Sequence, residues 1–288
     1  MQNSDLYGAI LARRSVRRYE RAPLDEGTLA QVRAIIAAVR PLVPGNRFYA
    51  EIKDLRPGED PTSELGGYGR IVNPPHYLVP YVVGSEHALT DLGYRSEQIA
   101  VRLAAIGIGS CFIGCIGREE AVRARFGLPE SARIAALLIF GRPSGGPGGR
   151  LFNTLMRTAV GAKNKRPIEG VFYSESFERS ARPPQHLVPL LEAARHAPSA
   201  DNAQPWRFLW HGGQLHLFVK RRNPRYGPGP NAQYNLHDGG LCMGNVLLAM
   251  EALGIEGHWA LYEGSEPQIP SHPCGFLPMA RLCLARAG

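Results

Sequence analysis

The chain has 288 residues, of which 44% are hydrophobic, so it is long enough to build one large domain or two small ones around a proper core. No run of residues approaches the ~18 consecutive apolar positions of a membrane-spanning helix, which argues against a membrane protein. The formal net charge is +8, but no helix-turn-helix, RRM or zinc-finger pattern accompanies it, so we expect an anionic small molecule rather than a nucleic acid as partner.

The cysteines and the N-terminus indicate neither a metal site nor export. Five cysteines stand at irregular spacing, and Cys111 and Cys115 lack the second pair that would complete a zinc site, so we expect reduced, buried thiols and no metal. Arg13 and Arg14 resemble a twin-arginine export signal, but acidic residues follow instead of an apolar stretch. The expected location is therefore the cytoplasm.

The N-terminal region combines a short helix with a dense group of basic side chains. Leu6, Ile10 and Leu11 begin the helix, which runs into Arg-Arg-Ser-Val-Arg-Arg-Tyr at 13–19. Arginine forks bind phosphate oxygens in a bidentate way and serine adds a neutral donor, so this composition is typical of an anion site. The alternative is an ordinary solvated basic face.

Periodicity predicts the next elements as far as the middle of the chain. The expected order is a helix at 27–40, a Gly- and Pro-rich loop over a pocket at 56–76, a buried strand at 77–83, a long helix at 91–107, a loop at 110–114, and an apolar strand at 134–140. Gly107 and Gly109 are expected to stop the long helix.

Three stretches follow in the second part of the chain. The Gly-rich segment at 144–149 lacks the Gly-Lys-Ser/Thr of a phosphate-binding loop, so we read it as a linker. The segment at 163–171 is basic, with Lys-Asn-Lys-Arg-Pro at its start. An amphipathic helix at 187–195 precedes Pro-Ser-Ala-Asp-Asn-Ala-Gln-Pro-Trp at 198–206, a string more specific than a loop requires.

The second part of the chain partly repeats the first. Residues 238–255 align without gaps with residues 91–108, at a constant offset of 147 residues. Asp91 pairs with Asp238 and Gly93 with Gly240 in this alignment. We interpret it as a diverged tandem duplication, with a first copy at 1–176 and a second, shorter copy at 177–288.

Four of these stretches resemble the FMN-dependent nitroreductase family. Residues 107–114 resemble its glycine-containing stretch that ends in aromatic-Ile-Gly and packs on the flavin ring. Residues 198–206 resemble its Pro-Ser-x-x-Asn-x-Gln-Pro-Trp motif, and residues 13–19 resemble its Arg-x-Ser-x-Arg-x-aromatic opening. Residues 163–167 resemble its basic-x-basic-x-Pro segment. The family would show its Pro-Ser-x-x-Asn motif after the helix expected at 27–40, where this chain has Pro-Leu-Val-Pro-Gly-Asn at 41–46. The motif is displaced into the second copy.

The resemblance implies a fold and a set of site residues. The expected fold is α+β, with mostly antiparallel sheet, packed helices and two degenerate copies that form an intramolecular pseudo-dimer. Arg17 would act catalytically, near the flavin N1 and C2 carbonyl, where reduction places negative charge. The remaining cofactor-binding residues implied are Arg13, Arg14, Ser15, Phe112, Ile113, Gly114, Lys163, Lys165, Pro198, Ser199, Ala200, Asn202 and Gln204.

The resemblance also implies an activity. NAD(P)H would donate hydride to FMN, and a nitroaromatic or a quinone would then take electrons in a ping-pong reaction. The protein would be a monomer with one flavin built from both copies. Alternatives are an FMN-binding carrier or sensor without turnover, and a basic nucleic-acid binder. His237 or His258 could donate protons, although a lone histidine is more often structural.

Overall fold

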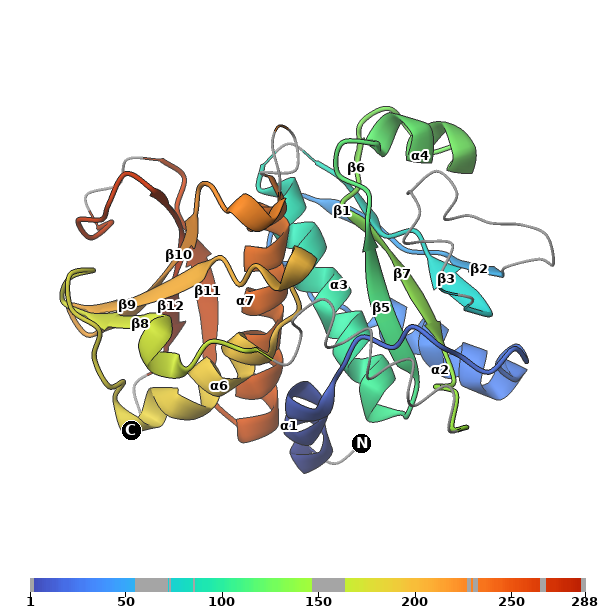
Figure 1. Cartoon of the computed structure of the whole chain (residues 1–288), viewed down its shortest axis with the longest axis horizontal. Coiled ribbons are helices and arrows are strands. Elements are labelled where there is room, and N and C mark those ends of the chain that lie inside the picture. The colour runs from blue at the N-terminus through green and yellow to red at the C-terminus, as the bar shows by residue number, and fades with distance from the viewer. Residues whose placement is uncertain are drawn as a thin grey trace.

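Two long helices, α3 (Ala88–Ala105) and α7 (Tyr234–Leu253), lie side by side in the middle of the molecule (Figure 1). The computed structural model describes residues 3–54, 72, 74–84, 86–146, 164–226, 229, 233–264 and 268–285. Nearly every side chain of both helices is buried. These helices are the two repeated segments, so the duplication places its own copies against each other.

Glycines allow the two helix backbones to touch, and they do so symmetrically. A Cβ atom on Gly93 would lie 2.2 Å from the carbonyl oxygen of His237, and one on Gly240 would lie 2.0 Å from that of Thr90. Gly93 and Gly240 are equivalent at the offset of 147, and so are Thr90 and His237. Reciprocal contacts of this kind define a two-fold relation. The two copies therefore form an internal pseudo-dimer with its axis between α3 and α7.

The first half contains two small antiparallel sheets. One has the order β1 (Arg47–Tyr49), β4 (Tyr81–Val83) and β6 (Ala132–Arg133). The other has the order β2 (Ile52–Asp54), β3 (His76–Leu78), β7 (Ala136–Gly141) and β5 (Gly109–Gly114). Helices α2 (Glu26–Ala37) and α4 (Glu119–Phe126) complete this half. Asp25 caps α2 by accepting a hydrogen bond of 2.8 Å from the Thr28 amide.

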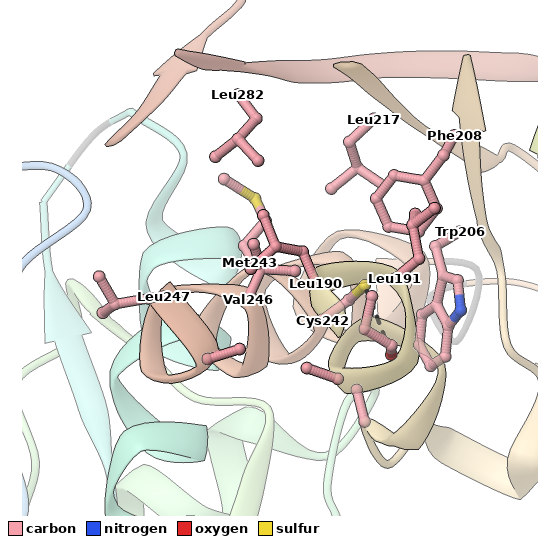
Figure 2. Packing of buried hydrophobic residues seen from close by; sticks show 14 of the residues in the cluster. Leu190, Leu191, Trp206, Phe208, Leu217, Cys242, Met243, Val246, Leu247 and Leu282 are labelled. Carbon is pink, nitrogen blue, oxygen red and sulfur yellow. Dashed lines mark hydrogen bonds between the residues drawn. The ribbon is translucent and has the colours of Figure 1, made fainter. Parts of the chain in front are cut away.

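The second half is a five-stranded sheet packed on α6 (Val188–His196) and α7. Its order is β11 (Gly257–Leu261), β12 (Phe276–Leu284), β10 (Gln214–Lys220), β9 (Trp206–His211) and β8 (Phe172–Ser174). Only the β8–β9 pair is parallel among the described strand pairs. Figure 2 shows Phe208 and Leu217 from the sheet above the helices that carry Leu190, Leu191 and Met243, with Trp206 beside them. The fold is α+β and mostly antiparallel, as predicted.

Segments cross between the halves at both ends of the first copy. Helix α1 (Asn3–Ala12) buries Leu6 and Ile10 in the hydrophobic core of the second half, against α6 and α7. Strand β8 lies before the predicted boundary at 176, yet it pairs with β9. The crossing of α1 brings the basic tract that follows it to the boundary between the two halves.

The structure corrects several local predictions. Residues 110–114, predicted as a loop, are most of β5, because Cys111, Phe112 and Ile113 pair along β7. The strand predicted at 77–83 is two strands in different sheets, since Pro80 has no N–H for a ladder and stands between them. Among the cysteines, Cys274 is exposed and Cys283 half-buried, so burial was wrong for these two; all five are free thiols.

Some predictions lie outside the described residues. They concern most of the loop predicted over 56–76, the end of the Gly-rich segment at 147–149, and Lys163. Within the described residues, no helix combines the length and apolar character that a membrane crossing requires.

Candidate functional site

The basic tract is fixed between α1 and β5. The Arg13 amide continues the helix by donating to the Ala9 carbonyl at 2.8 Å. Two residues later the chain turns extended, and the Val16 amide donates to the Ser110 carbonyl at 2.9 Å. Ser15 thereby forms a parallel bridge with Ser110 at the start of β5. This bridge places residues 13–17 next to Phe112, Ile113 and Gly114.

The 198–204 loop has a strained backbone that its neighbours hold in place. Asp201, Asn202 and Gln204 all have positive φ, between 48° and 51°, which is uncommon outside glycine. The Ser199 hydroxyl accepts from the Gln204 amide at 3.0 Å, and the side chain of Arg225 donates to the carbonyls of Asp201 and Asn202. Strain that is maintained this firmly is typical of ligand-binding loops.

Asp238 of α7 anchors the same loop from below. Its buried carboxylate accepts from the Ala200 amide at 3.0 Å and from the Tyr226 hydroxyl at 2.8 Å. Burial raises the pKa of Asp238, and burial together with the adjacent carboxylate raises the pKa of Tyr226. The equivalent Asp91 accepts from the Leu42 amide at 2.9 Å. The loop at 41–46 is therefore the structural counterpart of the loop at 198–202.

One cavity of about 660 Å³ brings these segments together. This volume lies within the range of small-molecule and cofactor pockets, ~300–1,000 Å³. Its walls come from the basic tract, from β5, from the 198–202 loop and from the first turns of α7. The predicted residues that line it are Arg13, Arg14, Ser15, Arg17, Phe112, Ile113, Gly114, Lys165, Pro198, Ser199, Ala200 and Asn202.

Two predicted residues are not among the lining residues. Gln204 lies behind the loop, where its side chain accepts from the Arg166 amide at 2.8 Å and donates to the Asn164 carbonyl at 3.0 Å. It positions the segment that leads into Lys165 rather than facing the cavity. Lys163 lies outside the described residues. Of the two histidines considered as proton donors, buried His237 lines the cavity, whereas His258 is exposed on β11.

Positive charge gathers at one end of the cavity. Lys165 donates to the Ala197 carbonyl, and burial together with the nearby Arg13 cation lowers its pKa to about 7. Arg17 is buried, and one of its guanidinium nitrogens donates to the Ser15 carbonyl at 3.3 Å. Arg13 forms an ion pair of 3.3 Å with Glu97, a fully buried residue of α3. Buried and half-buried cations gathered at one end of a cavity are suited to an anionic ligand.

The remaining wall is aromatic and hydrogen-bonding. Tyr234 accepts from the Ile116 amide at 3.0 Å and leaves no room for a side chain at Gly114, where a Cβ would lie 2.2 Å from the hydroxyl. His237 meets Phe112 edge-on, with ring centroids 6.1 Å apart. Exposed Arg118 and Asp201 also line the cavity, on segments from different halves.

Sequence reasoning missed several lining residues. Tyr226 and Tyr234 had no motif around them, and Arg118 is a single arginine at the N-cap of α4, just before Glu119 and Glu120. Asp238 carried a usable signal, because it repeats Asp91 at the offset of 147. Within the described residues, no group of three or more His, Cys, Asp or Glu side chains is arranged to hold a metal ion.

The fold and the motifs around this cavity define a nitroreductase-like protein with both copies in one chain. The chain belongs to the family described as "Putative TM nitroreductase", which matches residues 5–226. A crystal structure of a putative nitroreductase from Thermotoga maritima has the same fold, with a TM-score of 0.56, 19% identity, and coverage of 99% of this chain and 93% of that chain.

Two further solved structures match about half of the chain. An FMN-dependent nitroreductase from Clostridium difficile is 17% identical, with a TM-score of 0.39 and coverage of 47% of this chain and 86% of that chain. An NADPH:FMN oxidoreductase from Vibrio harveyi is 16% identical, with a TM-score of 0.40 and coverage of 50% of this chain and 70% of that chain. No curated protein matches the chain.

Proposed function

We propose that the protein is an FMN-dependent oxidoreductase that uses NAD(P)H to reduce nitroaromatics or quinones. The main support is that the basic tract, β5 and the 198–202 loop, which lie far apart in the sequence, line one cavity of about 660 Å³. Family membership gives the class of chemistry, an oxidoreductase. The residues at the cavity support FMN as the cofactor and suggest how it would be oriented.

The donor set fits a flavin with a terminal monophosphate. Arg13, Arg14, Ser15 and Lys165 would hold the phosphate and its sugar-alcohol chain, because guanidinium and ammonium groups form charge-assisted bonds with phosphate oxygens. Micromolar binding requires about −8 kcal/mol, which several such bonds and a buried ring can supply. FMN would supply two-electron chemistry, accepting hydride and passing electrons to an acceptor.

The other walls would orient the ring. Phe112, Ile113 and Gly114 supply one wall of β5, and Pro198 to Asn202 supply a second from the other half. Arg17 would sit where negative charge develops on reduction. Asp238 and Arg225 hold the backbone of the 198–202 loop, so its amides stay in fixed positions and ligand binding requires less reorganisation.

A visible absorbance spectrum of the purified protein, followed by mass spectrometry of the released ligand, tests the proposal. We expect a yellow protein that releases FMN and bleaches when NADH or NADPH is added without oxygen. A nitroaromatic or a quinone should then restore the colour. Release of FAD would contradict the cofactor assignment, and a bound flavin that neither nicotinamide bleaches would instead indicate a carrier.

A further inference from the structure

A fully buried acid lies directly behind the positive end of the cavity. Glu97 of α3 is 0% exposed, and its carboxylate is 3.3 Å from the Arg13 Nε. Within the described part of the chain, neither carboxylate oxygen has a hydrogen-bond partner of good geometry. An ionised carboxylate in this state is unfavourable, because it has lost water and gained only an ion pair.

The acid belongs to one copy only. Its equivalent at the offset of 147 is Gly244, which faces it across the pseudo-two-fold axis, and a Cβ on Gly244 would lie 3.2 Å from the Cβ of Glu97. The crossing of α3 and α7 thus makes room for Glu97 on the side of the motif-bearing cavity. The asymmetry suggests a role at that cavity rather than in holding the two copies together.

Arg13 and Lys165 are the charged groups that act on Glu97, and further groups on α6 and α7 interact with Lys165. Arg13 follows α1, and Lys165 precedes the strand β8; both line the cavity. The carboxylate of Asp238 and the thiol of Cys242, on α7, influence Lys165, as does Glu97 itself. His196 of α6 is influenced by Lys165 and contacts Glu192. Arg13 and Lys165 therefore stand between Glu97 and any anion in the cavity.

Both neighbours of the anion site change protonation near neutral pH. Burial raises the pKa of Glu97 to about 7, although Arg13 and Lys165 oppose the shift. Burial lowers the pKa of Lys165 to about 7. A bound anion favours the cationic form of Lys165 and the neutral form of Glu97, so it raises both pKa values. Anion binding should consequently take protons from solvent.

We propose that Glu97 is a positioning residue that becomes protonated when an anion binds to Arg13 and Lys165, so that binding of a phosphate monoester is coupled to proton uptake. The inference rests on the proposed function, because FMN is the anion considered. Neutralising Glu97 releases Arg13 from its ion pair and removes a negative charge behind the phosphate.

Calorimetry of flavin-free, full-length protein tests the coupling. FMN is titrated at pH 8 in buffers of different ionisation enthalpy. The number of protons taken up follows from the way the observed binding enthalpy changes with the ionisation enthalpy of the buffer. The phosphate, with a second pKa of about 6, is already a dianion there. We expect uptake of about one proton or more with FMN, and none with riboflavin, which has the same ring without the phosphate.

Glu97→Gln keeps the shape of the side chain and should lose about half a proton or more of this uptake. Each proton that is taken up on binding raises Kd tenfold for every unit of increase in pH. A difference of half a proton therefore means that, for each unit of increase in pH, the Kd of wild type for FMN should rise by a factor about threefold larger than that of the variant. The matched control is Glu251→Gln. Glu251 also lies in the central helix pair and forms ion pairs, with Arg40 and Arg102, but it does not line the cavity.

Three results would overturn the inference. Wild type could take up no proton with FMN, or it could take up as many protons with riboflavin as with FMN. In the third, Glu97→Gln takes up as many protons with FMN as wild type and Glu251→Gln do. If Glu97→Gln does not fold, the comparison of FMN with riboflavin in wild type decides alone. If neither flavin binds, the proposed function fails; titration with sulfate, which stays dianionic at pH 8, then tests the proton uptake separately.

Discussion

At the residue scale, Arg17 and Arg18 show how one step along the chain separates two identical side chains. Arg17 is buried and lines the cavity, whereas Arg18 is exposed and is not among the lining residues. The chain is extended here, beside β5, and successive side chains of an extended segment point to opposite sides. Substitution of Arg17 can therefore be compared with the same substitution of Arg18 as its control.

Arg17→Ala should lower the midpoint potential of the bound flavin. In the proposed site the cation would interact with negative charge that appears on reduction, so its loss should destabilise the reduced form more than the oxidised form. A loss of about 1.4 kcal/mol corresponds to about 30 mV for a two-electron couple. Spectroscopic titration against a redox dye measures the shift, and FMN affinity should change less.

Arg18→Ala removes the same charge from the solvent-facing side of the same segment. Its midpoint potential should stay within a few millivolts of wild type, because solvent and salt screen an exposed charge. Equal potentials for Arg17→Ala and wild type would mean that another cation faces the reduced ring.

At the scale of elements, the crossing of α3 and α7 depends on backbone contact rather than on interlocking side chains. Gly93, Gly240 and Gly244 each bring the opposite helix closer than a side chain would allow. The same crossing brings Asp238 under the 198–202 loop and Glu97 behind Arg13. The helix pair thus sets both the fold and the geometry of the cavity.

Gly240→Ala should destabilise the protein by about 1–3 kcal/mol or more, because the added Cβ would lie 2.0 Å from the Thr90 carbonyl and force the helices apart. Gly8→Ala is the matched control on α1, where a Cβ would meet nothing within 4 Å. Its higher helix propensity should stabilise by up to about 1 kcal/mol. Urea unfolding measures both, and equal effects would show that the crossing tolerates a side chain.

At the scale of the whole molecule, the two copies have diverged into unequal partners. Arg95, equivalent to Cys242 at the offset of 147, donates to Asp91 and to the carbonyls of Val43 and Asn46. It ties the first half's loop to α3 at the position that mirrors the cavity. The corresponding position in the second half is Cys242, a fully buried thiol of the hydrophobic core, so no arginine ties the 198–202 loop to α7 from this position.

Each chain should therefore bind one FMN and act as a monomer. The mirror position has Arg95 in place of Cys242 and lacks the Ser, Gln and Trp of the 198–206 motif. Native mass spectrometry of protein reconstituted with excess FMN gives both numbers at once. Two flavins per chain would show that the mirror position is also a site, and a dimer with one flavin would place the site between chains.

Much of this arrangement was predictable because it depends on local or repeated patterns. The existence of α3 and α7 and their C-terminal ends follow from the gapless repeat of 91–108 in 238–255, although both helices begin three or four residues earlier than the repeat does, and α6 follows from its amphipathic spacing. The motifs at 13–19 and 198–206 predicted eight residues that line one cavity, and the stretches at 110–114 and 163–167 predicted four more. Residues 110–114 were predicted wrongly as a loop, because a short apolar stretch before glycine does not reveal whether a strand is available to pair with it.

The sequence alone determined the family, the duplication and the residue types available to a phosphate-bearing ligand, since each is a property of composition, spacing or repeat. Only the tertiary structure decided that α1 crosses to the second half, that Asp238 anchors the 198–202 loop, and that Glu97 is buried behind Arg13. These features depend on contacts between residues far apart in the chain. Burial, which sets the protonation of Glu97 and Lys165, arises from that packing and has no local sequence signal.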